Sequence, residues 1–177
     1  LEIIINKNII KEKEISDSRI DSNLLTSLLT IKDSKLNDLK VNMSGGNHED
    51  SLNIIKSYGS IESINIANSF QDAIDFDFSD LDINQINVTN SGNDCIDVSA
   101  GKYLIKESTL YGCKDKGISV GEGSTLKIKN AQISESNIAL VSKDSSNLIL
   151  ENGILKNNKF CVAAYNKKQE FGPSDIS

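Results

Sequence analysis

A spacing of 22 residues recurs along the chain and constrains its fold more than any other feature. Six landmark positions lie 22 residues apart: Ser51, Ala73, Cys95, Gly117, Ala139 and Cys161. An apolar residue follows each of them: Leu52, Ile74, Ile96, Ile118, Leu140 and Val162. Repetition at a fixed short period is typical of solenoids, in which each repeat buries its apolar face against its neighbours.

Within each repeat the apolar residues alternate with polar ones, as in a strand with one buried face. Ile74, Phe76 and Phe78 are therefore expected to point inward. A second apolar set follows about ten residues later, and its register slips by one residue between the third and fourth repeats. Units of about 22 residues are too short to be helical repeats, so we predict an all-β fold. The specific prediction is a right-handed parallel β-helix, a single-stranded solenoid of about 22 residues per coil.

The repeat also predicts how the chain is divided. Residues 1–26 keep the period poorly and are interpreted as an irregular initial coil or cap, residues 27–166 as the β-helix, and residues 167–177 as a tail. The segment 44–50 is expected to bulge as a surface loop. Asn65 and Asn87, Asn68 and Asn90, and Ser69 and Ser91 recur at the period and are expected to stack as ladders at a corner, bonding the backbone of the next coil. A neighbouring domain or partner is expected to cover one end, because the tail leaves strand edges exposed.

Composition excludes two classes of partner. The 177 residues carry 19 Lys and Arg against 25 Asp and Glu, a net charge of −6, and the single arginine is Arg19. A nucleic-acid surface would need clustered basic residues. No apolar run approaches the length of a membrane span.

Two files of polar side chains are expected to run from coil to coil. If Ile74 and Phe76 point inward, Asp75 and Asp77 point outward, with Asp97, Ser99, Ser119 and Gly121 beside them. A second file stands just before each strand: Asp50, Asp72, Asp94 and Lys116. Stacked carboxylates repel one another unless a cation, a shared proton or a lysine offsets the charge.

Three interpretations of these files remain open. A solvated face is slightly favoured. Calcium could relieve the repulsion, at Asp72, Asp75, Asp94 and Asp97, although no cofactor is required. Paired carboxylates could also carry out acid–base chemistry on a glycosidic bond. The candidate binding residues are Asp75, Asp97, Ser119, Glu122, Lys143 and Tyr165, with Lys167 continuing the same side, and a long shallow groove there would suit a polysaccharide.

Two segments resemble a known enzyme family. Gly92–Val98 (GNDCIDV) and Gly112–Gly121 (GCKDKGISVG) resemble motifs of polygalacturonases, which are right-handed β-helix glycoside hydrolases. The resemblance implies catalytic roles for Asp72 and Asp94. Asn93 stands where that family has its general acid, and Lys116 stands where it has a histidine, so the hydrolytic mechanism lacks its central proton donor. The family's Arg-x-Lys clamp also has no counterpart, since Arg19 lies far upstream.

A broader resemblance covers about residues 72–172. The segments DKGISVGEGS, SKDSS and YNKKQEFG are similar to β-helix regions of bacterial surface or secreted proteins, some of them attached to CotH-kinase-like domains. These resemblances imply an extracellular or cell-surface module that faces a polysaccharide or cell-surface glycan without strong catalysis. The alternatives are a polysaccharide-modifying enzyme (hydrolase, lyase or epimerase) that uses Asp72, Asp94 and Lys116, and a purely structural spacer.

The cysteines leave two interpretations. The polygalacturonase resemblance implies a disulfide between Cys95 and Cys113, whereas three buried thiols acting as small apolar residues are slightly favoured. Cys161 lies three coils from Cys95, beyond disulfide reach. The lone His48 and the cysteines lack zinc-ligand spacing, and His48 is expected to be exposed to solvent.

Overall fold

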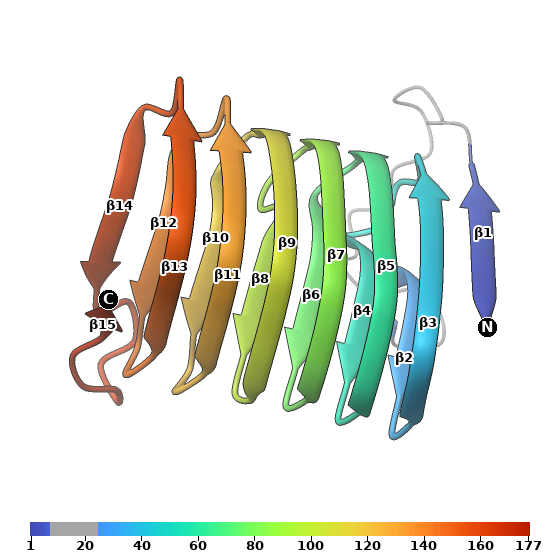
Figure 1. Ribbon diagram of the computed structural model, residues 1–177, viewed down its shortest axis with the longest axis horizontal. Helices are drawn as coiled ribbons and strands as arrows, with labels where there is room; N and C mark the ends of the chain where they lie inside the picture. The colour runs from blue at the N-terminus through green and yellow to red at the C-terminus, as the bar shows by residue number, and fades with distance from the viewer. Residues whose placement is uncertain (8–24) are drawn as a thin grey trace.

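The computed structural model describes residues 1–7 and 25–177 and contains two parallel β-sheets stacked into a solenoid (Figure 1). Sheet A comprises β1 (Glu2–Asn6), β3 (Lys35–Ser44), β5 (Tyr58–Ser69), β7 (Asp80–Ser91), β9 (Lys102–Cys113), β11 (Thr125–Ser134), β13 (Asn147–Lys156) and β15 (Asp175–Ile176). Sheet B comprises β2 (Ser27–Lys32), β4 (Asp50–Ile55), β6 (Asp72–Asp77), β8 (Ile96–Ser99), β10 (Lys116–Gly121), β12 (Ile138–Lys143) and β14 (Phe160–Tyr165). The prediction of an all-β parallel solenoid is confirmed.

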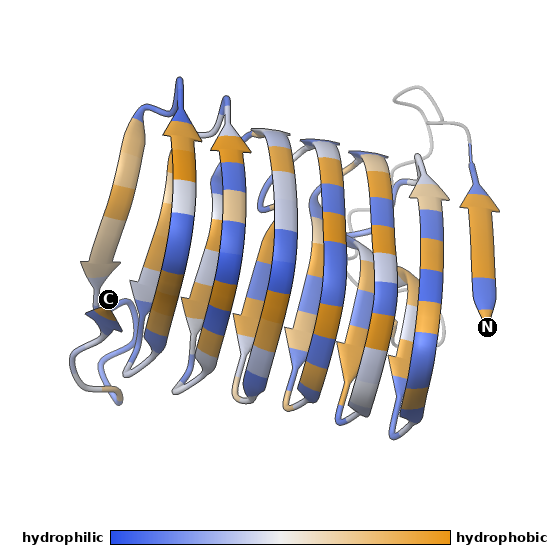
Figure 2. Ribbon diagram, viewed as in Figure 1, coloured by the Kyte–Doolittle hydropathy of each residue, from blue (hydrophilic) through white to orange (hydrophobic). Residues whose placement is uncertain are grey.

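From β2 to β13, each coil consists of one short strand in sheet B and one long strand in sheet A. Hydrophobic and hydrophilic residues alternate along both kinds of strand (Figure 2). The inward residues of sheet B form columns one coil apart, and Ile74, Ile96 and Ile118 are fully buried. Stacking these columns against those of sheet A removes apolar surface from water, which is the main favourable contribution to folding.

The prediction that Phe78 points inward is wrong. This residue is 58% exposed, and its backbone has a φ of 50°. β6 ends at Asp77, so the alternation stops one residue before Phe78, and the left-handed backbone there turns the chain toward sheet A. The prediction failed because a period-2 pattern does not reveal where a strand ends.

The one-residue register slip is confirmed and has a local cause. In sheet B, β8 and β10 pair at an offset of 22 residues, whereas β9 and β11 in sheet A pair at 23. The extra residue lies in the turn after Gly121, where Glu122 and Gly123 both have positive φ. Glycine adopts that backbone at little cost, so an inserted residue is accommodated without disturbing either sheet.

The predicted asparagine ladders are present, but their side chains bond one another instead of the backbone of the next coil. Asn87 donates to Asn65 Oδ1 at 2.8 Å, and Asn65 donates to Asn42 Oδ1 at 2.8 Å, so the amides bond each other and not the backbone. This ladder lies on the strands of sheet A, whereas Asn68 and Asn90 occupy left-handed positions at the bend. The serines do not extend the pattern, because Ser69 bonds Ser51 and Ser91 bonds a backbone carbonyl.

The segment 44–50 packs down instead of bulging. Gly45 and Gly46 are buried, and the amide of Gly45 donates to the carbonyl of Ala67 at 3.0 Å. Leu28 lies where a side chain at Gly46 would extend. His48 is half-buried in this segment, so the prediction that it is exposed was wrong.

The two ends of the solenoid differ. β1 pairs with β3 in regular register, which makes this part of the predicted cap an ordinary strand of sheet A. Most of the remaining cap, and Arg19, lie outside the described residues. At the other end, Val162 continues the core column of Ile118 and Leu140 but is 50% exposed, because no further coil among residues 1–7 and 25–177 covers it. The tail folds back as β15, which pairs with β13. That a neighbouring domain covers an end stays a prediction.

Within the described part of the chain, no helix is long and apolar enough to cross a membrane.

Candidate functional site

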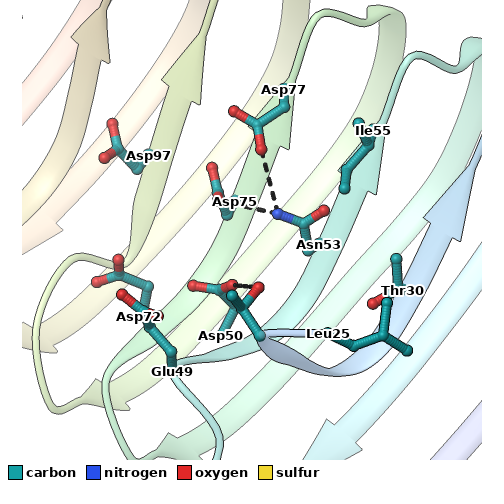
Figure 3. Close-up of a pocket in the computed structure, with 11 residues that line it drawn as sticks. Leu25, Thr30, Glu49, Asp50, Asn53, Ile55, Asp72, Asp75, Asp77 and Asp97 are labelled. Carbon is teal, nitrogen blue, oxygen red and sulfur yellow. Dashed lines mark hydrogen bonds between the residues drawn. The ribbon is translucent and has the colours of Figure 1, made fainter. Parts of the chain in front are cut away.

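The candidate site is a polar groove across the outer face of sheet B. It consists of two adjoining cavities that share Glu49, Asp72 and Asp97. The acidic half, of about 520 Å³, is lined by Leu25, Thr26, Thr30, Glu49, Asp50, Asn53, Ile55, Asp72, Asp75, Asp77 and Asp97 (Figure 3). The mixed half, of about 430 Å³, is lined by Glu49, Gln71, Asp72, Asn93, Asp94, Asp97, Asp115, Lys116, Lys143 and Lys167.

Three residues of the outward file, Asn53, Asp75 and Asp97, line the groove. Asn53, Asp75, Asp97 and Ser119 occupy the same position on four consecutive strands of sheet B, as the repeat predicts for the last three. Asn53 bridges two carboxylates, because its amide nitrogen donates to Asp75 Oδ2 at 2.9 Å and lies 3.3 Å from Asp77 Oδ2 (Figure 3). One amide therefore holds two acidic side chains in place.

The second file is held together by backbone hydrogen bonds. The amide of Asp94 donates to Asp72 Oδ1 at 2.7 Å, and the amide of Lys116 donates to Asp94 Oδ1 at 2.9 Å. Asn93 adds a bond from its side chain to Asp72 Oδ1 at 2.8 Å. The structure thus brings Asp72, Asp94 and Lys116 together in the predicted order.

Two carboxyl groups of the second file are buried, and the other carboxyl groups of the two files are half-buried. Asp50 is 4% exposed and Asp94 is 3% exposed. Burial penalises the charged form, and neighbouring carboxylates add to the effect. Burial accordingly raises the pKa of Asp50 and Asp72 to about 6.

Two further carboxyl groups are perturbed more strongly. Burial, with repulsion from Asp77 and Asp50, raises the pKa of Asp75 to about 9, so this side chain keeps its proton at neutral pH. Burial also raises the pKa of Asp94, to about 7, even though the charge of Lys116 opposes the increase.

The lysines concentrate at the other end of the groove. Lys116 Nζ lies 3.3 Å from Asp94 Oδ1 and makes an ion pair with Asp115. Burial disfavours the charged form of Lys116, but the hydrogen bond to Asp115 and the charge of Asp94 outweigh it and raise its pKa. Lys143 donates to Ser119 Oγ at 2.8 Å and lies 3.6 Å from Asp97 Oδ1. Lys116 is therefore not the only lysine that offsets the acidic files.

The tail supplies the third lysine of the groove. Asp144 is fully buried, and its Oδ1 accepts hydrogen bonds from the backbone amides of Lys167 and Lys168 at 2.6 and 2.8 Å. This anchor holds the start of the tail against the turn after β12. Lys167 then lines the mixed half of the groove, as its predicted position on that side implies.

The remaining predicted binding residues lie outside the groove lining. Ser119 is fully buried beneath Lys143, so it positions that lysine instead of facing a ligand. Glu122 makes an ion pair with Lys168 of the tail. Tyr165 is exposed on β14 and lines neither cavity.

Several groove residues are absent from the candidate site that the sequence predicts, among them Asp50, Asn53, Asp77 and Asp115. The repeat held a signal for Asn53 and Asp77, since both alternate with buried apolar residues on strands next to the acidic file. Asp115 was not recognisable, because its role depends on an ion pair with the adjacent Lys116 and on a hydrogen bond from Asn137 in the next coil.

A preformed calcium site is absent from the residues described. Calcium requires six to eight oxygen ligands around one point. In residues 1–7 and 25–177, no three or more acidic, histidine or cysteine side chains are arranged to hold a metal ion. The carboxylates are spread along the groove and are engaged with Asn53, with Lys116 and with backbone amides.

Cys95 and Cys113 form a disulfide, as the polygalacturonase resemblance implies. It joins the residue before β8 to the last residue of β9. The favoured alternative of three buried thiols was wrong, and it fails at Cys161 as well, because that free cysteine is exposed on β14. The inward apolar column ends at the last coil, so nothing described covers this thiol.

No family model, curated protein or solved structure matches this chain.

Proposed function

We propose that the groove on sheet B binds an extended polysaccharide or cell-surface glycan and that the chain acts as a binding module without strong catalysis. The observation that carries this proposal is the continuity of the two cavities, which share Glu49, Asp72 and Asp97. A long polar groove across several coils fits a linear polymer better than a compact ligand.

The chemistry of the lining supports a hydroxylated ligand. Carboxylates accept hydrogen bonds, ammonium groups donate them, and amides do both. Within the mixed half, Gln71 and Asn93 stand beside Lys116 and Lys143. Sugar hydroxyls both donate and accept, so they can satisfy each of these groups in turn.

The disulfide supports an extracellular or cell-surface location. Disulfides persist in oxidising compartments and are rare in the cytosol of most organisms. Cys95–Cys113 is buried in the core under the groove, where it constrains the coil that carries Asp94 and Asp97.

Glycan binding can be tested by calorimetric titration of the whole chain with a panel of neutral, acidic and amino polysaccharides. We expect at least one class to bind, and Asp97→Asn to weaken that binding. The matched control is Asp82→Asn, the same change at an exposed position on the outer face of sheet A. If no glycan binds, or if both variants weaken binding equally, the proposal is wrong and the spacer alternative is favoured.

One observation favours a polysaccharide-modifying enzyme as a second candidate. A general acid works best with a pKa near the working pH, and the pKa values of Asp72 and Asp94 are raised to about 6 and 7. Against this candidate, Asp94 is almost fully buried and Asn93 stands at the general-acid position of the resembled family. We expect no release of reducing ends or unsaturated products. Sustained turnover that Asp94→Asn abolishes would instead establish the enzyme.

A further inference from the structure

The acidic half of the groove contains five aspartates and no cation. Asp50, Asp72, Asp75, Asp77 and Asp97 line it, and none of the other lining residues that the structure describes is a lysine or arginine. Lys143 does not line this half, although its Nζ lies 3.6 Å from Asp97 Oδ1. Uncompensated carboxylates at this spacing repel one another, which leaves this half ready to gain free energy from a bound positive charge.

Asn53 gives an independent sign of a missing donor. This residue is 3% exposed, and its amide nitrogen is engaged with Asp75 and Asp77, which fixes which end of the amide is oxygen. Its Oδ1 is buried and has no hydrogen-bond partner. Figure 3 shows that oxygen pointing toward Ile55 and Thr30, which line the same cavity. A buried acceptor left unpaired costs free energy, so a ligand that donates to it is favoured.

An ammonium group fits these acceptors better than a metal ion does. A metal needs a compact shell of oxygen atoms, and no three or more of the described acidic, histidine or cysteine side chains are placed to form one. A primary ammonium instead has three N–H donors that can reach separate acceptors. Asn53 Oδ1 and the carboxylates that line the same cavity supply such acceptors, with Oδ1 on the side of the amide that faces away from Asp75 and Asp77.

We propose that the acidic half of the groove binds the protonated amine of an amino-sugar unit, so that the glycan of the proposed function is one with free amino groups. This inference rests on the proposed function and narrows it to one class of glycan. The amine lies within the acidic half, where the lining carboxylates and Asn53 Oδ1 offer acceptors. The hydroxyls of neighbouring sugar units face the mixed half, where Gln71 and Asn93 offer both donors and acceptors.

A measurable consequence is the release of a proton. Asp75 holds its proton at neutral pH because it is buried and faces Asp77 on its own strand, Asp50 and Asn53 on β4, Asp97 on β8, and Asp72. A neighbouring ammonium favours the charged carboxylate and lowers the pKa of Asp75. We therefore expect binding to release protons from the aspartates of the acidic half, which include Asp50, Asp72 and Asp75.

The experiment compares a short glucosamine oligomer with its fully N-acetylated counterpart, which has the same length and linkage but no charge. Each is titrated calorimetrically into the whole chain at about pH 6, where a sugar amine is charged, in two buffers of different ionisation enthalpy. We expect the amine form to bind about tenfold more tightly and to release protons. Asp75→Asn should reduce both the proton release and the preference, whereas Asp82→Asn should change neither.

The outcomes separate the inference from the proposed function. Equal binding of the two oligomers would overturn the amine site and leave glycan binding intact. Failure of both oligomers and of every other glycan would overturn both. Tighter binding of a free polyamine or a lysine-rich peptide than of the oligomer would overturn the assignment to a glycan. Cooperative unfolding of Asp75→Asn, and of Asp77→Asn as a second variant, verifies that each is folded.

Discussion

Lys116 donates twice to the same carboxylate oxygen of Asp94, from its backbone amide at 2.9 Å and from its ammonium at 3.3 Å. The first bond is fixed by the parallel register, and the second depends on the side chain alone. The pair therefore connects the geometry of the coil with the electrostatics of the groove. Removing the ammonium leaves the backbone bond in place and isolates the charge.

We expect Lys116→Met to lower the free energy of unfolding by about 1–3 kcal/mol, because a buried carboxylate loses its counter-charge. The loss should be larger at about pH 9 than at about pH 5, where Asp94 is protonated and needs no partner. Denaturant titration at both pH values measures it. Lys127→Met is the control, since its pair with Glu151 is exposed and contributes little. Equal losses for the two variants would contradict the role of Lys116.

The raised pKa values predict an unusual pH dependence of stability. Asp75 has a pKa of about 9 in the folded chain against 3.8 for the free side chain, so the folded state binds more protons between these values. Stability should therefore fall as the pH rises through this window and should recover on acidification toward about pH 4. Asp75→Asn should reduce that slope by up to about 1.4 kcal/mol per pH unit. An unchanged slope would show that Asp75 is ionised at neutral pH.

The coil assignment can be tested by comparing a core position that is covered on both sides with the same position in the last coil. Ile118 is fully buried between two coils, whereas Val162 occupies the same column in the last coil and is half-exposed. We expect Ile118→Ala to cost about 2–5 kcal/mol and Val162→Ala under about 1 kcal/mol, because only the first leaves a cavity. Thermal or denaturant unfolding measures both. A small loss of stability for Ile118→Ala would show that Ile118 is not a core residue.

The disulfide should contribute measurably to stability. It closes a loop of 18 residues, so Cys95→Ala with Cys113→Ala should cost about 3 kcal/mol, chiefly because the unfolded chain regains conformational entropy. Cys161→Ser should be nearly neutral, since this thiol is exposed and free. Unfolding under oxidising and reducing conditions measures both changes. Loss of stability in the Cys161 variant alone would contradict the assignment of the disulfide to Cys95 and Cys113.

Calcium should have no specific effect on stability. Any ion that binds the folded chain raises its melting temperature by linkage, but the described carboxylates form no metal cluster. Millimolar calcium and magnesium should therefore act alike, and no more than sodium chloride at the same ionic strength. Asp75→Asn with Asp97→Asn should stabilise the folded chain at neutral pH, because it removes the charge of Asp97 and the cost of protonating Asp75 on folding. A shift specific to calcium that this double variant abolishes would establish a calcium site.

The sequence by itself determined the fold and the order of the groove residues. A period of 22 residues forces position n to lie beside position n+22, so the adjacency of Asp75 with Asp97 and of Asp72 with Asp94 follows from the repeat once the strands are parallel. The alternation of apolar and polar residues then decides which face each side chain takes. Both features are local or periodic, which is why they can be read along the chain.

The tertiary structure alone decided the depth and the chemistry of the groove. Burial of Asp50 and Asp94, the bridge from Asn53 to two carboxylates, and the anchoring of Lys167 by Asp144 depend on contacts between coils and on turns that break the period. Phe78 shows the same limit, since a single left-handed residue ended its strand. Ionisation depends on solvent exclusion and on all surrounding charges at once, so a row of aspartates in the sequence cannot reveal which of them keep their protons.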